Sequence, residues 1–323
     1  MPRVLITTVP FARANKLPLE LMQSAGIEYE INPLNRKLRE HELRELIGGY
    51  DAVIAGTEQI TDTVFENADR LKLISRVGIG LDGVDLIAAK RRQIQVCYTP
   101  DAPAPAVSEL TIGLMLTLLR KVHIANGGMH NRVWSRHFGR RISEVTIGII
   151  GYGRIGQGVL ERLSSFSPGK VLVNDINNSL LSSNSISFES ATKTEIYENA
   201  DVISLHLPLT AKTRGLIGYR ELKSMKTDAV LLNTSRGGII DEDKLAQIMN
   251  EGHLSGAAID VFESEPYDGP LCDIDRCLLT CHMGSMSNDC RERMEIEATE
   301  EVVRFFNRER LMNPVPDELY EIM

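Results

Sequence analysis

The feature that most constrains the fold of this chain is a glycine-rich turn set between a strand-like run and a helix-like run. The apolar run "VTIGII" leads into "GYGRIG", residues 151–156, and the amphipathic run "QGVLERL" follows. The first run has the composition of a buried strand, and the last has apolar residues at helical spacing. A G-x-G-x-x-G turn in this setting joins a parallel strand to a helix, so the sequence predicts an α/β sheet here.

The same turn predicts a dinucleotide site. Gly151 permits a tight turn, Gly153 lets phosphates approach the backbone, and Gly156 lets the helix pack against the strand. The start of the helix offers unpaired N–H groups and a partial positive charge. The next strand, "KVLVND", ends at Asp175, whose carboxylate can accept hydrogen bonds from ribose hydroxyls and repels a 2′-phosphate. The following "INNS" contains no Arg, so NAD is predicted rather than NADP.

Strand-like runs alternate with helical runs along the whole chain. Before the turn the strand-like runs are "RVLITTV", "YDAVIAG", "LKLISRVG" and "IQVCYT"; from the turn onward they are "VTIGIIG", "KVLVND", "DVISLHLP", "AVLLNTS", "GAAIDVF" and "CLLT". Such alternation predicts the α/β class, with parallel sheets flanked by helices. We expect two Rossmann-like or flavodoxin-like domains, which a chain of 323 residues is long enough to form.

Two long helical patterns, 108–122 and 288–308, are expected to link the domains. A Pro/Ala-rich hinge at 99–106 precedes the first, with Ser108 as its expected N-cap. The last helix can return the chain to the first domain. The expected division is a substrate-binding (lid) domain at 1–100, completed by 288–323, and an NAD-binding Rossmann domain at 101–287.

Charge and composition argue against several classes of binding partner. The formal net charge of −8 argues against nucleic acid or an anionic membrane as a partner. No apolar run approaches the roughly 18 residues needed to span a bilayer, and the first apolar run is too short for a signal peptide. Of the five cysteines, Cys97 stands alone and four lie within 272–290 without a C-x-x-C pair. We therefore expect a cytoplasmic protein with reduced thiols, no metal and a small-molecule substrate.

Three later strand-like runs are each followed by a residue suited to 2-oxo acid chemistry. Arg236 follows "LLNTS", Glu265 follows "AAIDVF" and His282 follows "LLT". Arg can bind a carboxylate and polarise a keto oxygen, and His can carry a proton near neutral pH. Glu beside the imidazole stabilises its charged form and fixes its tautomer. Each residue alone is compatible with an ordinary surface position, but together beside a dinucleotide turn they predict an oxidoreductase.

These motifs resemble the D-2-hydroxyacid dehydrogenase family, whose members include glycerate, lactate and phosphoglycerate dehydrogenases. "LKLISRVGIGLDGVDL" resembles the family's substrate loop, "VSELTIGLMLTLLR" its interdomain helix and "GIIGYGRIGQ" its cofactor turn. "LHLPLTAKTRGLI", "LLNTSRGGIIDEDKL", "GAAIDVFESEP" and "TCHMGS" resemble its later signatures, so the likeness covers nearly the whole chain. It implies hydride transfer between NADH and a 2-oxo acid, giving a D-2-hydroxy acid, with closure of the two domains over the substrate.

The resemblance also implies residue roles. Arg236, Glu265 and His282 correspond to the catalytic residues, with Arg236 also binding substrate. The backbone amides of Val77, Gly78 and Ile79 correspond to the loop that holds the substrate carboxylate. Implied for cofactor binding are Gly151, Gly153, Arg154, Ile155 and Gly156 at the phosphates, Asp175 at the ribose, His206 and Pro208 at the adenosine, Thr111 near the nicotinamide, Asp260 at the carboxamide, and Thr234, Ser235, His282 and Gly284.

The chain departs from the family pattern in two places. Cys281 stands where relatives usually carry Pro before the catalytic His, and no Arg occurs in "AGTEQIT" at 55–61. An Arg in that loop typically binds the phosphate in phosphoglycerate dehydrogenases, and Glu58 is expected to add repulsion there. An unphosphorylated substrate is therefore favoured, although Arg76, Arg136 or Arg140 can still supply a positive charge.

Other functions on the same fold stay open. Some relatives are NAD-dependent corepressors that bind peptides, and an intact Arg–Glu–His trio does not exclude that function. Formate dehydrogenases carry Gln where this chain has Glu265, which argues against that activity. A homodimer is expected by analogy, through the crossing helix and the arm around "NGGMHNRVWSRHFGRRI". Trp134 and Phe138 in that arm are either apolar anchors for a partner or ordinary core residues.

Overall fold

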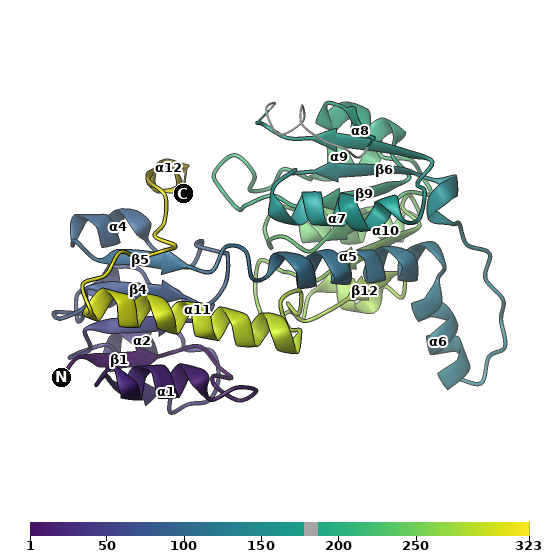
Figure 1. Ribbon diagram of the computed structural model, residues 1–323. Coiled ribbons are helices and arrows are strands. Elements are labelled where there is room, and N and C mark those ends of the chain that lie inside the picture. The colour runs from purple at the N-terminus through teal and green to yellow at the C-terminus, as the bar shows by residue number, and fades with distance from the viewer. Residues whose placement is uncertain (178–186, 323) are drawn as a thin grey trace. The chain divides into compact units, whose positions relative to one another are not determined.

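The computed structural model describes residues 1–177 and 187–322 and divides the chain into two compact units. Unit 1 comprises Met1–Pro103 and Ser285–Met323, and unit 2 comprises Ala104–Gly284. The sequence placed these boundaries after residues 100 and 287. Helices α5 and α11 begin directly or shortly after the two junctions (Figure 1).

Unit 1 is built on a five-stranded parallel sheet in the order β2-β1-β3-β4-β5. Its central strands are fully or almost fully buried, because helices pack on both faces of a parallel sheet. The strands are β1 (Arg3–Ile6), β2 (Glu28–Ile31), β3 (Ala52–Ala55), β4 (Leu73–Arg76) and β5 (Gln95–Tyr98). The helices are α1 (Leu17–Ser24), α2 (Glu40–Leu46), α3 (Asp62–Phe65), α4 (Leu86–Arg91), α11 (Asn288–Phe306) and α12 (Asp317–Ile322).

Unit 2 carries a seven-stranded parallel sheet in the order β12-β11-β10-β9-β6-β7-β8. Its strands are β6 (Thr146–Ile150), β7 (Lys170–Asn174), β8 (Glu189–Ser190), β9 (Val202–Leu205), β10 (Val230–Asn233), β11 (Gly256–Ile259) and β12 (Cys277–Leu279). Its helices are α5 (Ala104–Leu119), α6 (Val122–His130), η1 (Ile142–Glu144), α7 (Arg154–Ser164), α8 (Lys193–Asn199), α9 (Tyr219–Ser224), α10 (Glu242–Asn250) and η3 (Pro270–Asp273).

Alternate side chains of these strands form two separate cores in unit 2. On β9, Val202 belongs to the core under α5 and α7, whereas Ile203 belongs to the core under α8, α9 and α10. The two helical layers lie on opposite faces of the sheet (Figure 1). This arrangement follows from the two-residue period of a strand and explains why these strands read as continuous apolar runs.

The sequence missed two edge strands. β2 ("EYEI") has three exposed residues out of four, and β8 consists of the exposed pair Glu189 and Ser190. Edge strands need little apolar surface, so neither produced a strand-like run. Asp260 was expected inside a strand but directly follows β11.

The first long helix also differs from the prediction. Instead of one helix over 108–122, α5 begins at Ala104, and Lys121 in a left-handed conformation (φ +53°) separates it from α6. Pro105 is tolerated in the first turn of a helix, where its missing N–H breaks no hydrogen bond. Ser108 is therefore not an N-cap: it is buried in the second turn, and its hydroxyl donates to the Ala104 carbonyl at 2.7 Å.

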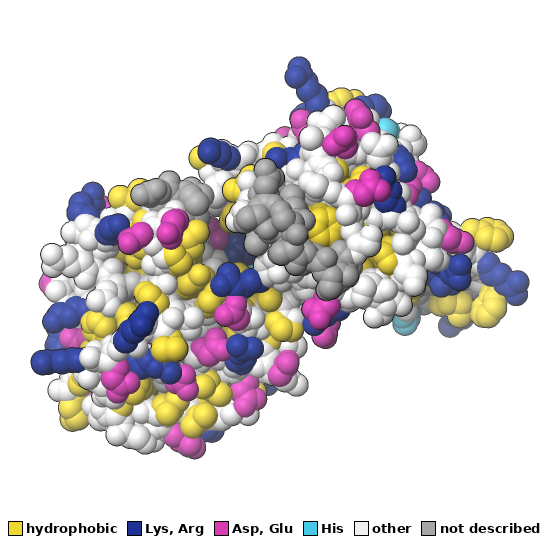
Figure 2. Space-filling model, turned by 45° about the horizontal axis from the view of Figure 1, so that its top comes forward, with side chains coloured by type: hydrophobic (Ala, Val, Ile, Leu, Met, Phe, Trp, Pro, Cys, Tyr) yellow, Lys and Arg dark blue, Asp and Glu magenta, His cyan; other side chains and the backbone are white. Residues whose placement is uncertain are grey.

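Charged side chains of both signs lie on the face of the molecule seen in Figure 2. Figure 2 shows Lys and Arg interspersed with Asp and Glu on the visible face of each unit. In the described part of the chain, none of the helices combines the length and the apolar character that a bilayer crossing requires.

Candidate functional site

The glycine turn after β6 has the geometry of a phosphate-binding loop. Gly151 adopts φ +97°, and a Cβ there would collide with the carbonyl oxygen of His206. A Cβ on Gly156 would collide with the carbonyl oxygen of Gly151. Gly153, the N-cap of α7, is different, because a Cβ there would meet no atom within 4 Å. The protein's own packing thus requires glycine at 151 and 156. Gly153 instead borders open space beside the first turn of α7.

Asp175 is held beside this turn. Its Oδ2 accepts a hydrogen bond from the Tyr152 N–H at 2.6 Å, and its Oδ1 accepts one from the Asn177 N–H at 2.8 Å. The carboxylate at the end of β7 is therefore positioned relative to the phosphate loop, as a ribose ligand requires. The end of the "INNS" run, residues 178–179, lies outside the described residues.

His206 follows β9 and has an unsatisfied ring nitrogen. Its Nε2 lies 2.9 Å from the Ser204 hydroxyl, whereas the buried Nδ1 has no partner in the described part of the chain. Burial lowers the pKa of His206 to about 4, so the ring is neutral at pH 7. A buried polar atom without a partner beside the glycine turn fits a bound nucleoside. Pro208, two residues later, is exposed.

The His206 pKa predicts a pH-dependent stability. The unfolded chain takes up a proton on this ring between pH 6.5 and 4 and the folded protein does not, so the stabilisation present above pH 6.5 is lost as the pH falls. We expect urea unfolding of the wild type to show a loss of up to ~2 kcal/mol between pH 7 and pH 5 that His206→Asn lacks. An equal loss in both proteins would contradict the assignment.

A polar cluster around the end of β10 shapes the loop that carries Arg236. The Thr234 hydroxyl lies 2.8 Å from the Thr111 hydroxyl of α5. Asn233 accepts hydrogen bonds from both the N–H and the hydroxyl of Ser235, and its Nδ2 donates to the Arg236 carbonyl at 2.8 Å. The sequence reasoning missed Asn233, although a polar residue at the end of an apolar strand was a usable signal.

Arg236 lies in a tightly packed turn. Its Nη1 donates to the Ser235 carbonyl at 2.6 Å. A Cβ on Gly237 would overlap the backbone of Phe262, so the Arg236 turn and the segment leading to Glu265 are in backbone contact. Only glycine permits this approach, which brings two of the predicted catalytic residues into neighbouring segments.

Glu265 and His282 form the hydrogen-bonded pair that the sequence predicted. Both carboxylate oxygens of Glu265 lie 3.0 Å from His282 Nδ1, and Oε1 also accepts the Phe262 N–H at 3.2 Å. The two side chains are 26% and 38% exposed, so the pair is accessible. A carboxylate can only accept, so Nδ1 carries a proton and Nε2 is the ring nitrogen left to exchange one.

The backbone of His282 is held by Asp260. His282 adopts a left-handed conformation (φ +50°), and its N–H donates to the Asp260 carbonyl at 2.7 Å. The buried Asp260 carboxylate accepts the N–H groups of Met283 and Gly284, each at 2.9 Å, and the Thr280 hydroxyl at 2.6 Å. In this structure Asp260 therefore organises the turn that presents the imidazole.

In unit 1, two of the three amides expected to bind the substrate carboxylate already have acceptors. The Val77 N–H donates to the Ala55 carbonyl at 2.9 Å, and the Gly78 N–H donates to the Thr99 hydroxyl at 2.8 Å. The Ile79 N–H has no acceptor within the described ranges. Of the three, Ile79 is the amide available to a ligand in this structure.

The Glu58 side chain is buried inside the turn that follows β3. The residue is 2% exposed, and its carboxylate accepts hydrogen bonds from the Gly56 N–H at 2.9 Å and from the Thr7 hydroxyl. Glu58 therefore lies inside the turn rather than on its surface, and the repulsion expected of it stays a prediction.

The cysteines are unpaired thiols. Cys97 and Cys290 are buried, Cys277 is partly buried, and Cys272 and Cys281 are exposed. Burial raises the pKa of Cys290 to about 11 and that of Cys277 to about 12, so both thiols are protonated at pH 7. Within the residues that the structure describes, no three His, Cys, Asp or Glu side chains gather in a group suited to a metal.

Known proteins are similar to this chain in sequence and fold. The family model "D-isomer specific 2-hydroxyacid dehydrogenase, NAD binding domain" matches residues 112–284. A D-3-phosphoglycerate dehydrogenase of Methanocaldococcus jannaschii is 35% identical over 86% of this chain, which spans only 54% of that relative's length. A hydroxypyruvate reductase of Thermotoga maritima is 33% identical, covering 85% of this chain and 91% of that one. The crystal structure of the TT0316 protein from Thermus thermophilus superimposes with a TM-score of 0.87 at 31% identity, covering 97% of this chain and 100% of that one.

Proposed function

Because the chain belongs to the D-isomer-specific 2-hydroxyacid dehydrogenases, an NAD-dependent oxidoreductase family, we propose that it interconverts a short, unphosphorylated 2-oxo acid and the corresponding D-2-hydroxy acid. The observation that carries this proposal is the contact between Glu265 and His282 Nδ1 at 3.0 Å. It leaves Nε2 available for proton exchange on a turn that Asp260 holds in place.

In the proposed reaction His282 and Glu265 handle the proton, and Arg236 binds the substrate. Bound NAD supplies or accepts the hydride. His282 Nε2 gives a proton to the substrate oxygen during reduction and takes it back during oxidation. Glu265 keeps Nδ1 protonated and stabilises the imidazolium when it forms. Arg236 attracts the carboxylate and polarises the carbonyl oxygen.

The cofactor is proposed to bind along the carboxyl edge of the unit 2 sheet, where open α/β sheets bind their ligands. The first turn of α7 would hold the pyrophosphate through the open space at Gly153 and through the N–H groups of Arg154 and Ile155. Asp175 would bind the ribose. Remaining contacts are assigned to Gly151, Gly156, His206, Pro208, Thr111, Thr234, Ser235, Asp260, His282 and Gly284.

The substrate is proposed to be small and unphosphorylated, such as hydroxypyruvate or glyoxylate. The 55–61 loop of unit 1 contains no Arg. The loop itself therefore offers a phosphate no side chain of the kind that binds it bidentately. Of the amides at Val77, Gly78 and Ile79, the one at Ile79 is proposed to bind the carboxylate, because the other two already donate within unit 1. The T. maritima relative, named hydroxypyruvate reductase, supports this size class.

A substrate panel tests this proposal. NADH oxidation is followed with glyoxylate, pyruvate, hydroxypyruvate and phosphohydroxypyruvate. We expect kcat/KM for hydroxypyruvate or glyoxylate to exceed that for phosphohydroxypyruvate by at least about tenfold. A preference for phosphohydroxypyruvate would refute the unphosphorylated class. Tight NADH binding without turnover on any acid would favour the corepressor-like function instead.

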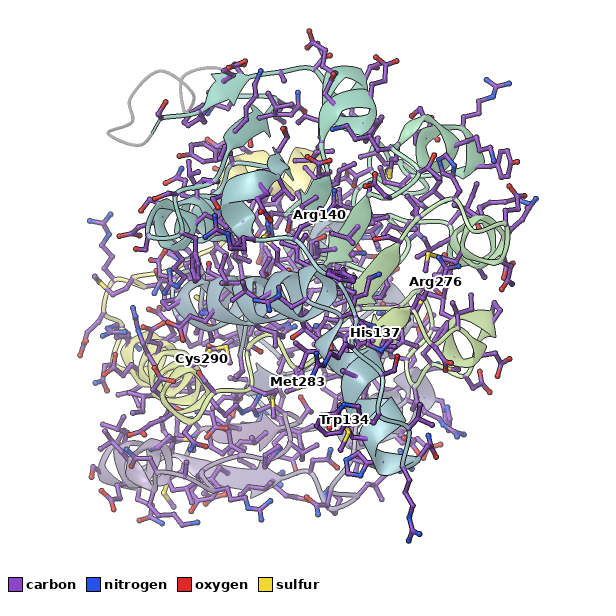
Figure 3. All side chains as sticks on the ribbon, turned by 90° about the vertical axis from the view of Figure 1, so that its right-hand side faces the viewer. Trp134, His137, Arg140, Arg276, Met283 and Cys290 are labelled. Carbon is purple, nitrogen blue, oxygen red and sulfur yellow. The ribbon has the colours of Figure 1, made fainter. Side chains whose placement is uncertain are left out.

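We further propose a homodimer formed through the arm, residues 131–139, that follows α6. Every residue of the arm is exposed, and Trp134 and Phe138 are 79% and 96% exposed. Figure 3 shows Trp134 and His137 beside α6, with Arg140 farther along the chain. The arm is anchored where the Arg140 N–H donates to the Leu119 carbonyl at 3.0 Å. Trp134 and Phe138 are therefore not core residues of this unit, and large apolar side chains exposed close together favour a partner.

The arm predicts a monomeric variant. Trp134→Ser combined with Phe138→Ser removes two aromatic anchors and is expected to convert the dimer to monomer in sedimentation at micromolar concentration. Ile87→Ser, which removes an apolar side chain 62% exposed on unit 1, serves as the control and is expected to stay dimeric. A monomeric wild type, or a dimeric double variant, would show that the arm does not form the interface.

A further inference from the structure

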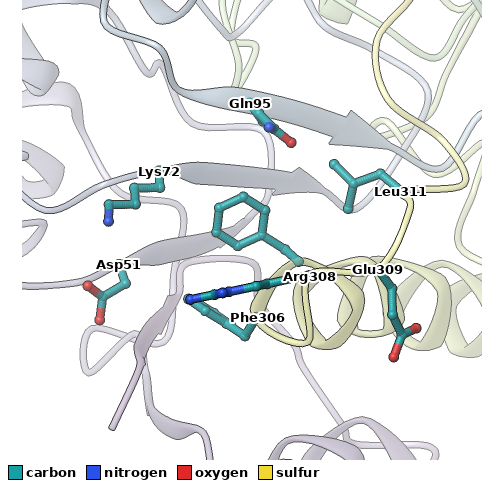
Figure 4. Close-up of a pocket in the computed structure, with 8 residues that line it drawn as sticks. Asp51, Lys72, Gln95, Phe306, Arg308, Glu309 and Leu311 are labelled. Carbon is teal, nitrogen blue, oxygen red and sulfur yellow. The ribbon is translucent and has the colours of Figure 1, made fainter.

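Unit 1 contains a hollow that the proposed function does not use. It lies where Asp51 precedes β3, Lys72 precedes β4 and Gln95 begins β5, at the amino ends of these parallel strands. The loop carrying Gly78 follows β4 at the opposite edge. The cavity measures about 490 Å³, within the range of small-molecule sites (Figure 4).

The floor of the hollow is aromatic. Phe305 and Phe306, the last residues of α11, meet edge to face with ring centroids 5.3 Å apart. Both rings are only partly buried, and Leu311 lines the far side. Figure 4 shows the Phe306 ring beside the Arg308 side chain. Such a floor offers a planar apolar molecule contact with ring faces and edges.

The rim of the hollow has positive charge that the protein does not neutralise. Neither the Lys72 nor the Arg308 side chain has a hydrogen-bond or ion-pair partner among the described residues. The Asp51 carboxylate pairs with Arg70: the Arg70 Nη2 lies 2.9 Å from each of the two Asp51 carboxylate oxygens. Glu309 accepts a hydrogen bond from Asn307, and in Figure 4 its carboxylate points away from Lys72 and Arg308. The two cations therefore favour an anionic ligand.

Arg308 occupies a backbone position that normally selects glycine. The Arg308 N–H donates to the Phe305 carbonyl at 3.1 Å, and the Glu309 N–H donates to the Arg304 carbonyl at 2.9 Å. These two bonds define a Schellman motif, in which the residue after the C-cap is left-handed and is usually Gly. Arg308 adopts φ +60° there despite its long side chain.

We propose that this hollow binds a small organic anion with a planar apolar body, of the aromatic carboxylate class. Phe305 and Phe306 contact the ring, and Lys72 and Arg308 bind the carboxylate. Gln95 supplies an amide at the upper edge of the hollow (Figure 4). The inference is independent of the reaction proposed above, because all of its residues lie in unit 1 and at the amino edge of the sheet.

Benzoate is the probe, and its dissociation constant is measured by ligand-observed NMR titration. Arg308→Gly and Lys72→Gln are each expected to weaken binding at least about tenfold, since each removes a charged hydrogen-bond donor. Arg310→Gly, which removes a neighbouring exposed Arg outside the hollow, is the control and is expected to bind as the wild type does. Because glycine suits the left-handed position, Arg308→Gly should melt at the wild-type temperature or above, which separates lost binding from lost folding.

Benzyl alcohol, which lacks the charge, and acetate, which lacks the ring, are each expected to bind at least about tenfold more weakly than benzoate. Wild-type affinity in both Arg308→Gly and Lys72→Gln overturns the proposal. So does affinity that is lost in Arg236→Ala and retained in Arg308→Gly, since the benzoate would then occupy the candidate active site. Benzyl alcohol binding as tightly as benzoate overturns the assignment of an anionic ligand.

Discussion

Replacing His282 by alanine is expected to lower kcat for 2-oxo acid reduction about 10²–10⁴-fold, the usual contribution of a positioned general acid. The imidazole is the proposed proton donor. Its Nδ1 is hydrogen-bonded to Glu265 at 3.0 Å, so Nε2 is the ring nitrogen that donates, and the substitution removes it. NADH affinity, measured by fluorescence titration, should fall far less than kcat, because His282 is only one of many residues assigned to cofactor contacts. The combination of retained cofactor binding and lost turnover is the signature of a residue that acts on the reacting oxygen.

Glu265→Gln is the matched variant for this experiment. Glutamine keeps an acceptor for Nδ1 and removes the negative charge that stabilises the imidazolium, so kcat should fall less than in His282→Ala. A His282→Ala enzyme that retains more than a tenth of wild-type kcat would exclude the imidazole as the proton donor. Activity unaffected by both substitutions would remove the observation on which the proposed function rests.

The glycine turn gives the second large effect, through a pair of substitutions that differ only in position. Gly151→Ala places a Cβ against the His206 carbonyl at φ +97° and is expected to cost about 2–5 kcal/mol of unfolding free energy. Gly153→Ala adds the same methyl group where no protein atom lies within 4 Å, so its stability should stay within about 1 kcal/mol of the wild type. Urea unfolding without cofactor measures both.

NADH binding then separates the two roles. Gly153→Ala should bind NADH at least about tenfold more weakly although it is stably folded, because the methyl group occupies space proposed for the pyrophosphate. Gly151→Ala should lose both stability and binding. If Gly153→Ala binds NADH with wild-type affinity, the phosphates do not lie over this turn, and the cofactor assignments of the neighbouring residues must be revised.

The strands and helices that the sequence predicted well are those whose signal is local. β6, β9 and β10 are buried on both faces and appear as short apolar runs bounded by turn residues. β2 was missed because an edge strand with Glu28 and Glu30 carries no such run. Ser108 was misread as a helix start because a serine before a helical pattern is the usual N-cap, and nothing local shows that Pro105 is tolerated one turn earlier.

The candidate site divides in the same way. Arg236, Glu265 and His282 could be predicted because residues that follow parallel strands come to one edge of a sheet. Two further residues support that site. Asn233, at the end of β10, donates to the Arg236 carbonyl in the loop that follows, and the Thr280 hydroxyl after β12 donates to Asp260 after β11. The position of Asn233 at the end of an apolar strand was a local signal, but the acceptors that Asn233 and Thr280 bond to are visible only in the tertiary structure.

The sequence by itself determined the fold class, the strand–turn–helix at 151–156 and the residue types of the candidate site. These follow from steric and hydrophobic patterns that extend over a few neighbouring residues. Only the tertiary structure decided that Glu58 faces inward, that two of the three expected carboxylate-binding amides already donate within unit 1, and that Lys72 and Arg308 line one hollow together with two phenyl rings. Each of these depends on contacts between segments far apart in the chain, and no local pattern encodes which donor will find which acceptor across such a distance.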